Sequence, residues 1–136
     1  MESNRTIRLR WLHGAVQDVT HQLAGLRFSR PGPHAWRPAI NAYRCEKCIT
    51  ICVDLAGVER SDIDLAIEPQ RLSIRGVRDV PEPRGKEDPA LQMIAMEIDY
   101  GPFEREVRLP GEVDVKKVRA EQKNGLLWIH LPLKKP

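Results

Sequence analysis

From Lys47 onward, apolar and polar residues alternate with a period of two along several short segments. Such a pattern places every second side chain on one face of a β-strand, so each segment is expected to bury one face and expose the other. The apolar positions are Ile49, Ile51, Val53 and Leu55; Ile63, Leu65 and Ile67; Leu72 and Ile74; and Leu127, Ile129 and Leu131. Strands of this length predict an all-β antiparallel sandwich rather than a βαβ fold.

Turn-forming residues separate these strands. They are Gly57, Glu68-Pro69-Gln70, Tyr100-Gly101-Pro102, Pro110-Gly111 and Asn124-Gly125. Asn-Gly favours a two-residue hairpin turn, because both residues tolerate a positive φ. Residues 78–89 are rich in proline and charge, which predicts an exposed loop. Residues 91–98 are apolar enough to form a further strand, and a strand after a long loop is suited to reaching a neighbouring subunit.

The first 38 residues follow a different pattern. Apolar side chains recur every three or four positions over residues 7–28, which predicts a marginal amphipathic helix. Its apolar stripe includes Trp11, Leu12, Val16, Val19 and Leu23. Residues 31–38 (PGPHAWRP) predict a linker, because proline cannot continue a helix. The stripe is expected to contact other subunits or other proteins, although a basic amphipathic helix would also suit an anionic membrane surface.

Charge is divided unevenly along the chain. The 136 residues contain 22 Lys plus Arg against 19 Asp plus Glu, but residues 1–38 hold six Arg against Glu2 and Asp18. The remainder is therefore slightly acidic, which predicts no nucleic-acid partner. No run of about 18 apolar residues is present, so we expect no membrane span. The start lacks a secretory pattern, which favours a cytoplasmic location, although an Arg-rich start also suits an organelle transit peptide.

Cys45, Cys48 and Cys52 form a C-x2-C-x3-C pattern that resembles a metal site. On an alternating strand, Cys48 and Cys52 would lie about 13 Å apart, too far for one disulfide or one zinc ion. Cys45 precedes the strand and could approach Cys48 only through a turn. We therefore expect reduced thiols and no metal.

No set of residues indicates catalysis. His13, His21 and His34 lie in the first 38 residues and His130 in the last strand, and none neighbours a Ser or Cys nucleophile in a recognisable frame. A glycine-rich phosphate loop is also absent from the sequence. We expect no enzymatic activity and no cofactor.

Two sequence blocks are specific enough to indicate a family. They are Tyr100-Gly101-Pro102-Phe103-Glu104-Arg105 followed by Arg108-Leu109-Pro110, and Ala120-Glu121-Gln122-Lys123-Asn124-Gly125-Leu126-Leu127. Weaker blocks are Leu55-Ala56-Gly57-Val58, Asp62-Ile63, Leu72-Ser73-Ile74 and Leu131-Pro132. In order and spacing they resemble the α-crystallin domain of small heat shock proteins, over about residues 39–133.

The resemblance implies an immunoglobulin-like β-sandwich over residues 39–133, a partly helical arm with linker over 1–38 and a short tail over 134–136. It also implies an ATP-independent holdase of the stress response, which binds unfolding proteins and suppresses their aggregation. Self-association into dimers, and further into oligomers, is expected. The alternative is a non-chaperone interaction module or a co-chaperone with a p23-like sandwich.

Interaction residues follow from the resemblance. The apolar stripe of the arm, with Trp11, Leu12, Val16, Val19 and Leu23, would bind unfolding clients and other subunits. Ile63, Leu65 and Ile67, with the strand over residues 118–121, would line a groove, whereas the alternative for these apolar residues is core packing. Alternation places Arg105 on the same face as Phe103 and Val107. A buried guanidinium needs an acceptor, and the resemblance implies one across a dimer interface that also contains Met93, Ile94 and Met96. The alternative is an Arg at a sheet rim that pairs within its own chain.

Two positions depart from the family pattern. Ala56 stands where the family commonly has proline, but Gly57 still permits the turn. The I-x-I type docking motif of the family's C-terminal tail is missing, since the sequence ends at Lys134-Lys135-Pro136. Leu131-Pro132-Leu133 has similar spacing, although the family ends its domain there. We therefore expect assembly beyond the dimer to be weak and to depend on the arm.

Overall fold

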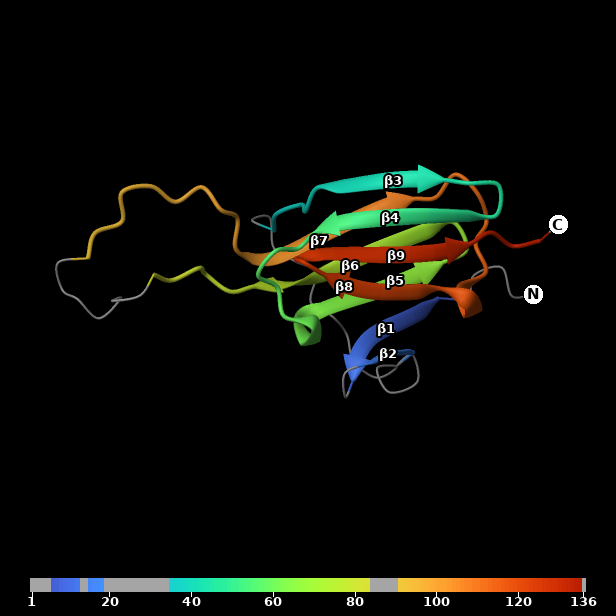
Figure 1. Ribbon diagram of the computed structural model, residues 1–136, viewed down its shortest axis with the longest axis horizontal. Coiled ribbons are helices and arrows are strands. Elements are labelled where there is room, and N and C mark those ends of the chain that lie inside the picture. Colours follow the sequence, from blue (N-terminus) through green and yellow to red (C-terminus); the bar gives the residue numbers. More distant parts are fainter. Residues whose placement is uncertain (1–5, 13–14, 19–34, 84–90, 136) are drawn as a thin grey trace.

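Two antiparallel β-sheets pack face to face in the computed structural model, which describes residues 6–12, 15–18, 35–83 and 91–135 (Figure 1). The five-stranded sheet has the order β2 (Ala15–Asp18), β1 (Ile7–Leu12), β5 (Ile63–Glu68), β6 (Arg71–Arg78) and β7 (Gly101–Arg108). The four-stranded sheet has the order β3 (Ile40–Arg44), β4 (Cys48–Asp54), β9 (Leu126–Pro132) and β8 (Arg119–Lys123). Two short 3-10 turns cover Arg60–Asp62 and Val115–Lys117. The predicted all-β sandwich is confirmed.

The predicted alternation decides which side chains form the core. In β5 and β9 every second residue is buried, and the intervening residues are partly exposed. The largest fully buried side chains are Phe103, Ile49, Ile51, Leu55, Ile63, Leu65, Ile67, Leu72, Ile74, Leu127, Ile129 and Leu131. They come from both sheets, so one apolar layer fills the space between them.

The Asn124-Gly125 turn has the predicted hairpin geometry. Both residues have positive φ, 54° and 79°, and Lys123 faces Leu126 across the turn. A turn of this kind matches the right-handed twist of paired strands. It therefore sets the register of β8 against β9.

The predicted helix over residues 7–28 is wrong where the structure describes the chain. Residues 7–12 form β1, whose Ile7 and Leu9 face Ile67 and Leu65 of β5, and residues 15–18 form β2. Leu9 and Trp11 are buried in the core, and Val16 packs against it. The pattern Ile-Arg-Leu-Arg-Trp also alternates, and pairing with β5 gives these residues hydrogen bonds and apolar burial that a separate helix lacks.

The predicted strand over residues 91–98 does not form within the single chain, where the segment pairs with no strand in the described residues. Its pairing with a neighbouring subunit stays a prediction. Residues 79–83 and 91–100 run away from the sandwich as one long excursion (Figure 1). A strand needs a hydrogen-bonding neighbour, and the described residues provide none at this distance from the sheets. No helix among the described residues has the length and apolarity to cross a membrane.

The end of the linker packs on the sandwich. Trp36 N–H donates to the Pro102 carbonyl (3.2 Å), and the Trp36 carbonyl accepts from Glu104 N–H (3.0 Å). Its indole Nε1–H donates to the Gly101 carbonyl (3.1 Å), and its ring centre lies 5.2 Å from that of Phe103. Trp36 therefore covers the outer edge of β7.

Candidate interaction surfaces

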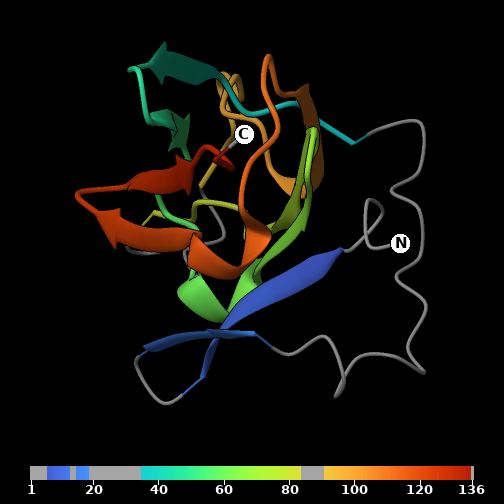
Figure 2. The same ribbon diagram turned by 90° about the vertical axis from the view of Figure 1, so that its right-hand side faces the viewer.

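No strand among the described residues covers the outer edge of β3. β3 is the first strand of its sheet and pairs only with β4 among the described residues. Its residues after Ile40 are exposed, including Tyr43. An uncovered edge presents backbone N–H and C=O groups that can pair with another chain. The opposite edge of this sheet, at β8, lies beside β2 (Figure 2).

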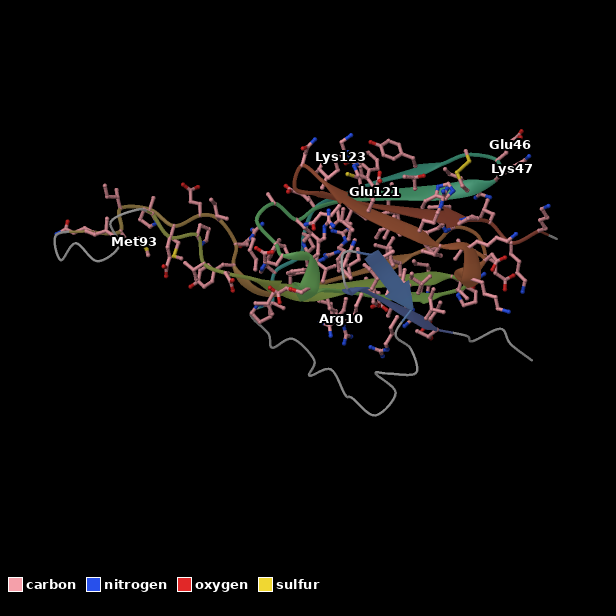
Figure 3. The ribbon with its side chains drawn as sticks, turned by 60° about the horizontal axis from the view of Figure 1, so that its bottom comes forward. Arg10, Glu46, Lys47, Met93, Glu121 and Lys123 are labelled. Carbon is pink, nitrogen blue, oxygen red and sulfur yellow. A yellow bond between two sulfur atoms is a disulfide. The ribbon has the colours of Figure 1, made fainter. Side chains whose placement is uncertain are left out.

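The excursion carries an exposed apolar stripe. Met93, Ile94 and Met96 are 72%, 98% and 42% exposed, and Figure 3 places Met93 at the far end of the excursion. Leu91, Ile98 and Tyr100 are exposed as well. Apolar side chains in one contiguous exposed segment mark an interaction surface.

Arg78 holds the base of this excursion. Its guanidinium donates to the carbonyls of Asp99 and Ala56, in the latter case at 3.1 Å from Nη1. The same group lies over the Trp36 ring, 4.1 Å from the ring centre. One cation thereby links both ends of the excursion to the linker.

Arg105 lies on the expected face of β7, next to buried Phe103 and half-buried Val107. Its Nη1 donates to the Pro38 carbonyl at 3.5 Å, a contact within its own chain. Its Nε is buried and has no hydrogen-bond partner within the described part of the chain. A buried donor without an acceptor is unfavourable, so this atom still requires a partner. The predicted acceptor across a dimer interface stays a prediction.

The expected groove residues lie in the core. Ile63, Leu65 and Ile67 are fully buried, as in the alternative that the sequence left open. β1 pairs with the edge of β5 that faces away from β6. These three side chains therefore line no open groove in this conformation. On the 118–121 side, a hollow of about 700 Å³ opens between β2 and the β8–β9 hairpin, and its lining includes Val16, Val118, Ala120 and Trp128.

The arm residues are only partly described. Trp11 is buried and Val16 is half-buried, so neither is a freely exposed client surface in this conformation. Leu12 lies in β1 opposite Ala15. Val19 and Leu23 lie outside the described residues. Leu131 is buried in β9 and Leu133 pairs with Val113, so the Leu-Pro-Leu segment packs within its own chain.

The cysteines differ from expectation at one pair. A disulfide joins Cys45 to Cys48 across the β3–β4 turn, so the prediction of reduced thiols is wrong for these two. The two-residue turn brings their Cα atoms within 5.2 Å, which a continuous strand would not allow. Cys52 is free and buried on β4, and burial raises the pKa of its thiol.

Sequence reasoning missed Trp36, Arg78 and the Cys45–Cys48 pair. Trp36 lies in the predicted linker, and only its contacts with Phe103 and Arg78 reveal a structural role. The cysteine pair had a usable signal, because C-x2-C places both residues at facing positions whenever the two intervening residues form a hairpin turn.

Comparisons with known proteins agree with this geometry. The Hsp20/alpha crystallin family matches residues 42–136. Spore protein SP21 of Stigmatella aurantiaca is 35% identical over 104 residues, which are 76% of this chain and 59% of that protein. The 18 kDa antigen 1 of Mycobacterium avium is 31% identical over 71% of this chain and 64% of its own length. The chain thus spans less than two thirds of these two relatives.

Solved structures share the sandwich. Heat shock protein 16.0 from Schizosaccharomyces pombe has a TM-score of 0.66 at 25% identity, over 79% of this chain and 73% of that one. The hspA protein from Xanthomonas axonopodis has a TM-score of 0.61 at 27% identity, over 73% of this chain and 95% of that one. Because the family match covers most of the sequence and these structures share its fold, the chain belongs to the Hsp20/alpha crystallin family of small heat shock proteins.

Proposed function

We propose that the protein is an ATP-independent holdase chaperone, which binds unfolding proteins and suppresses their aggregation. Family membership supports a chaperone role. The observation that carries the proposal is the presence, on one small domain, of an uncovered β3 edge and a long exposed apolar excursion. Backbone pairing at an edge and apolar contact at the excursion both recognise unfolded chains regardless of sequence.

Self-association uses the same two surfaces in this proposal. The excursion of one copy, with Met93, Ile94 and Met96, docks on the β3 edge of a second copy and forms there the strand that it lacks in a single chain. Each copy docks its excursion on the β3 edge of the other, so the two copies form a closed symmetric dimer. The buried Nε of Arg105 then finds its acceptor in the partner.

The arm contributes to client binding after β1 leaves β5. Release of β1 would expose Leu9 and Trp11 together with the edge of β5, which adds apolar surface and a second open edge. β1 and β2 are the two outermost strands on one side of the five-stranded sheet, and such peripheral elements open locally more easily than central strands. Higher oligomers form where a released β1 pairs with a neighbour.

The chaperone function is tested with several unrelated enzymes that aggregate on heating or on reduction. Near-equimolar protein without ATP should slow the rise in light scattering and leave the enzymes soluble but inactive. Holding unfolded chains lowers their free concentration, and aggregation is of high order in that concentration. Unchanged aggregation at several-fold excess would leave the non-chaperone interaction module as the better assignment.

The docking surface is tested with a matched pair of variants. Ile94→Lys places a charge in the proposed interface, whereas Val80→Lys places one at the base of the excursion, where the side chain is already 40% exposed. Sedimentation velocity should show a weakened dimer for Ile94→Lys and an unchanged one for Val80→Lys. Equal sedimentation of both variants would place the interface elsewhere.

A further inference from the structure

The β3–β4 turn brings two cysteines to facing positions. Arg44 pairs with Ile49, so Cys45 and Cys48 form the next cross-strand pair, and Cys45 N–H donates to the Cys48 carbonyl at 2.9 Å. Only Glu46 and Lys47 lie between them, and Figure 3 shows the sulfur–sulfur bond beside these two residues at one end of the sandwich. The disulfide therefore closes a very small ring, which gains the least from restricting the unfolded chain.

The residues of this turn do little to hold it. Three hairpins in the described chain have two-residue turns, at 46–47, 69–70 and 124–125. The last has Asn-Gly with positive φ, and 69–70 has a proline that presets φ. Glu46 and Lys47 have neither advantage, since Asn124 is the single non-glycine residue with positive φ in the described part of the chain. At 46–47 the disulfide therefore holds the two strand ends together, a role that the turn residues themselves have at 69–70 and 124–125.

The pair is accessible and lies among basic groups. Cys45 is exposed and Cys48 is half-buried, with Arg44 and Lys47 exposed beside them. The Lys47 carbonyl accepts from Leu133 N–H at 2.8 Å, which brings the backbone leading to Lys134 alongside the turn. Glu46 is the acidic residue within the turn. A small thiol can therefore reach the exposed side of this disulfide, which attack on one of its sulfur atoms requires.

Cys52 provides an internal contrast. It lies on the same strand as Cys48 but is 7% exposed, and burial raises the pKa of its thiol. A buried neutral thiol is a poor nucleophile and is hidden from small reagents. Exchange chemistry at this end of the sandwich is thereby restricted to Cys45 and Cys48.

We propose that Cys45 and Cys48 form a reversible exchange site for small thiols of the glutathione class, and that their disulfide keeps the end of β3 in register. In reduction, one glutathione thiolate attacks a protein sulfur, which forms a mixed disulfide and releases the other cysteine as a thiolate. A second glutathione thiolate then displaces the remaining cysteine. Two electrons pass to the protein disulfide, the two cysteine thiolates take up protons, and one glutathione disulfide leaves.

Reduction has a structural consequence at the β3 edge. Without the cross-link, the turn at Glu46 and Lys47 loosens, and the end of β3 separates more often from β4. Docking of a partner or client on that edge would then depend on the redox state of the pair. This consequence for docking rests on the proposed function, whereas the exchange and the loosening do not.

The exchange is tested on the full chain by equilibration with glutathione buffers of increasing reducing power, followed by alkylation and mass spectrometry. Cys45 and Cys48 should gain and lose alkylation together in one transition, while Cys52 should stay unmodified until the protein is denatured. A pair that stays oxidised in every buffer would be a purely structural disulfide and would overturn the proposal. Independent alkylation of the two cysteines would overturn it as well.

Variants separate the two parts of the inference. Cys52→Ala should leave the transition unchanged, and Cys45→Ser should leave Cys48 carrying a single glutathione in oxidising buffer. Amide hydrogen exchange should rise several-fold over residues 40–44 on reduction of the native protein, and stay high in Cys45→Ser in every buffer, with the β8–β9 hairpin unchanged. Equal amide hydrogen exchange in both redox states would refute the proposal that the disulfide keeps β3 in register. None of these measurements depends on chaperone activity. The hydrogen exchange is measured in Ile94→Lys, so that docking of a second copy on β3 does not protect its amides.

Discussion

Arg10 and Asp64 form an ion pair across the junction of the N-terminal hairpin and the sandwich, with Arg10 Nε 2.8 Å from Asp64 Oδ1. Arg10 also donates from Nη2 to the Ser61 carbonyl at 2.8 Å. On the opposite face of β1, Leu9 and Trp11 are buried in the core. β1 thus has an ion pair on one face and apolar packing on the other. Figure 3 labels Arg10 on this strand.

Asp64→Asn should leave the protein as stable as the wild type at neutral pH, or up to about 1 kcal/mol more stable. Burial raises the pKa of the Asp64 carboxyl, and Arg10, Arg8 and Arg75 offset this only in part. A carboxyl with a raised folded pKa stabilises the fold in acid and loses this contribution as pH rises through that pKa. Urea unfolding at neutral pH and in mild acid should show that the wild type gains stability on acidification relative to the variant. Asp62→Asn is the control, and a clear loss of stability in Asp64→Asn at neutral pH would mean that the ion pair outweighs burial.

Trp11→Ala should lower the free energy of unfolding by about 3 kcal/mol, in the range for removing a large buried side chain. Trp11 is 9% exposed and packs in the core. Hydrogen exchange of β5 amides should rise as well, because β1 no longer covers that edge. Trp128→Ala, at a half-buried position outside the core, is the control. A change below about 0.5 kcal/mol in Trp11→Ala would indicate that β1 is detached in solution.

Arg105→Ala should weaken the dimer by about 3 to 5 kcal/mol if the buried Nε meets an acceptor in the partner, since the variant leaves that acceptor unpaired. Dissociation measured by analytical ultracentrifugation would report the change. Arg108→Ala, exposed on the same strand, should alter it by less than about 1 kcal/mol. Equal effects of the two variants would favour a rim residue that uses only the Pro38 carbonyl.

Gly76→Ala should destabilise the fold by about 1 to 3 kcal/mol or more, because overpacking forces neighbours apart. A Cβ at Gly76 would collide with the backbone oxygen of Asp62 and with the Phe103 ring. At Gly111 the nearest atom is Leu133 Cδ2 at 3.0 Å, the end of a flexible side chain, so Gly111→Ala should cost less than about 1 kcal/mol. Thermal unfolding of both variants provides the comparison, and equal costs would show that β6 and β7 can separate at Gly76.

Alternation predicted the sandwich because it acts locally: a period of two places Ile63, Leu65 and Ile67 on one face wherever the strand is finally paired. Turn chemistry was local too, and Asn124-Gly125 adopts the φ values that its residue types favour. The motif around Phe103 and Arg105 identified the family for the same reason, since order and spacing are properties of the sequence alone.

Pairing partners, in contrast, were decided only by tertiary structure. Residues 7–12 carry both a helical and an alternating pattern. They form a strand because pairing with β5 satisfies their backbone hydrogen bonds and buries their apolar side chains in the core. Residues 91–98 have strand-like composition but no neighbour within the described chain, so they remain extended and exposed. Cys45 and Cys48 meet because a turn reverses the chain between them, which spacing along a continuous strand excluded. In each case the structure depends on which segments of the folded chain come into contact. A local sequence pattern does not specify those contacts.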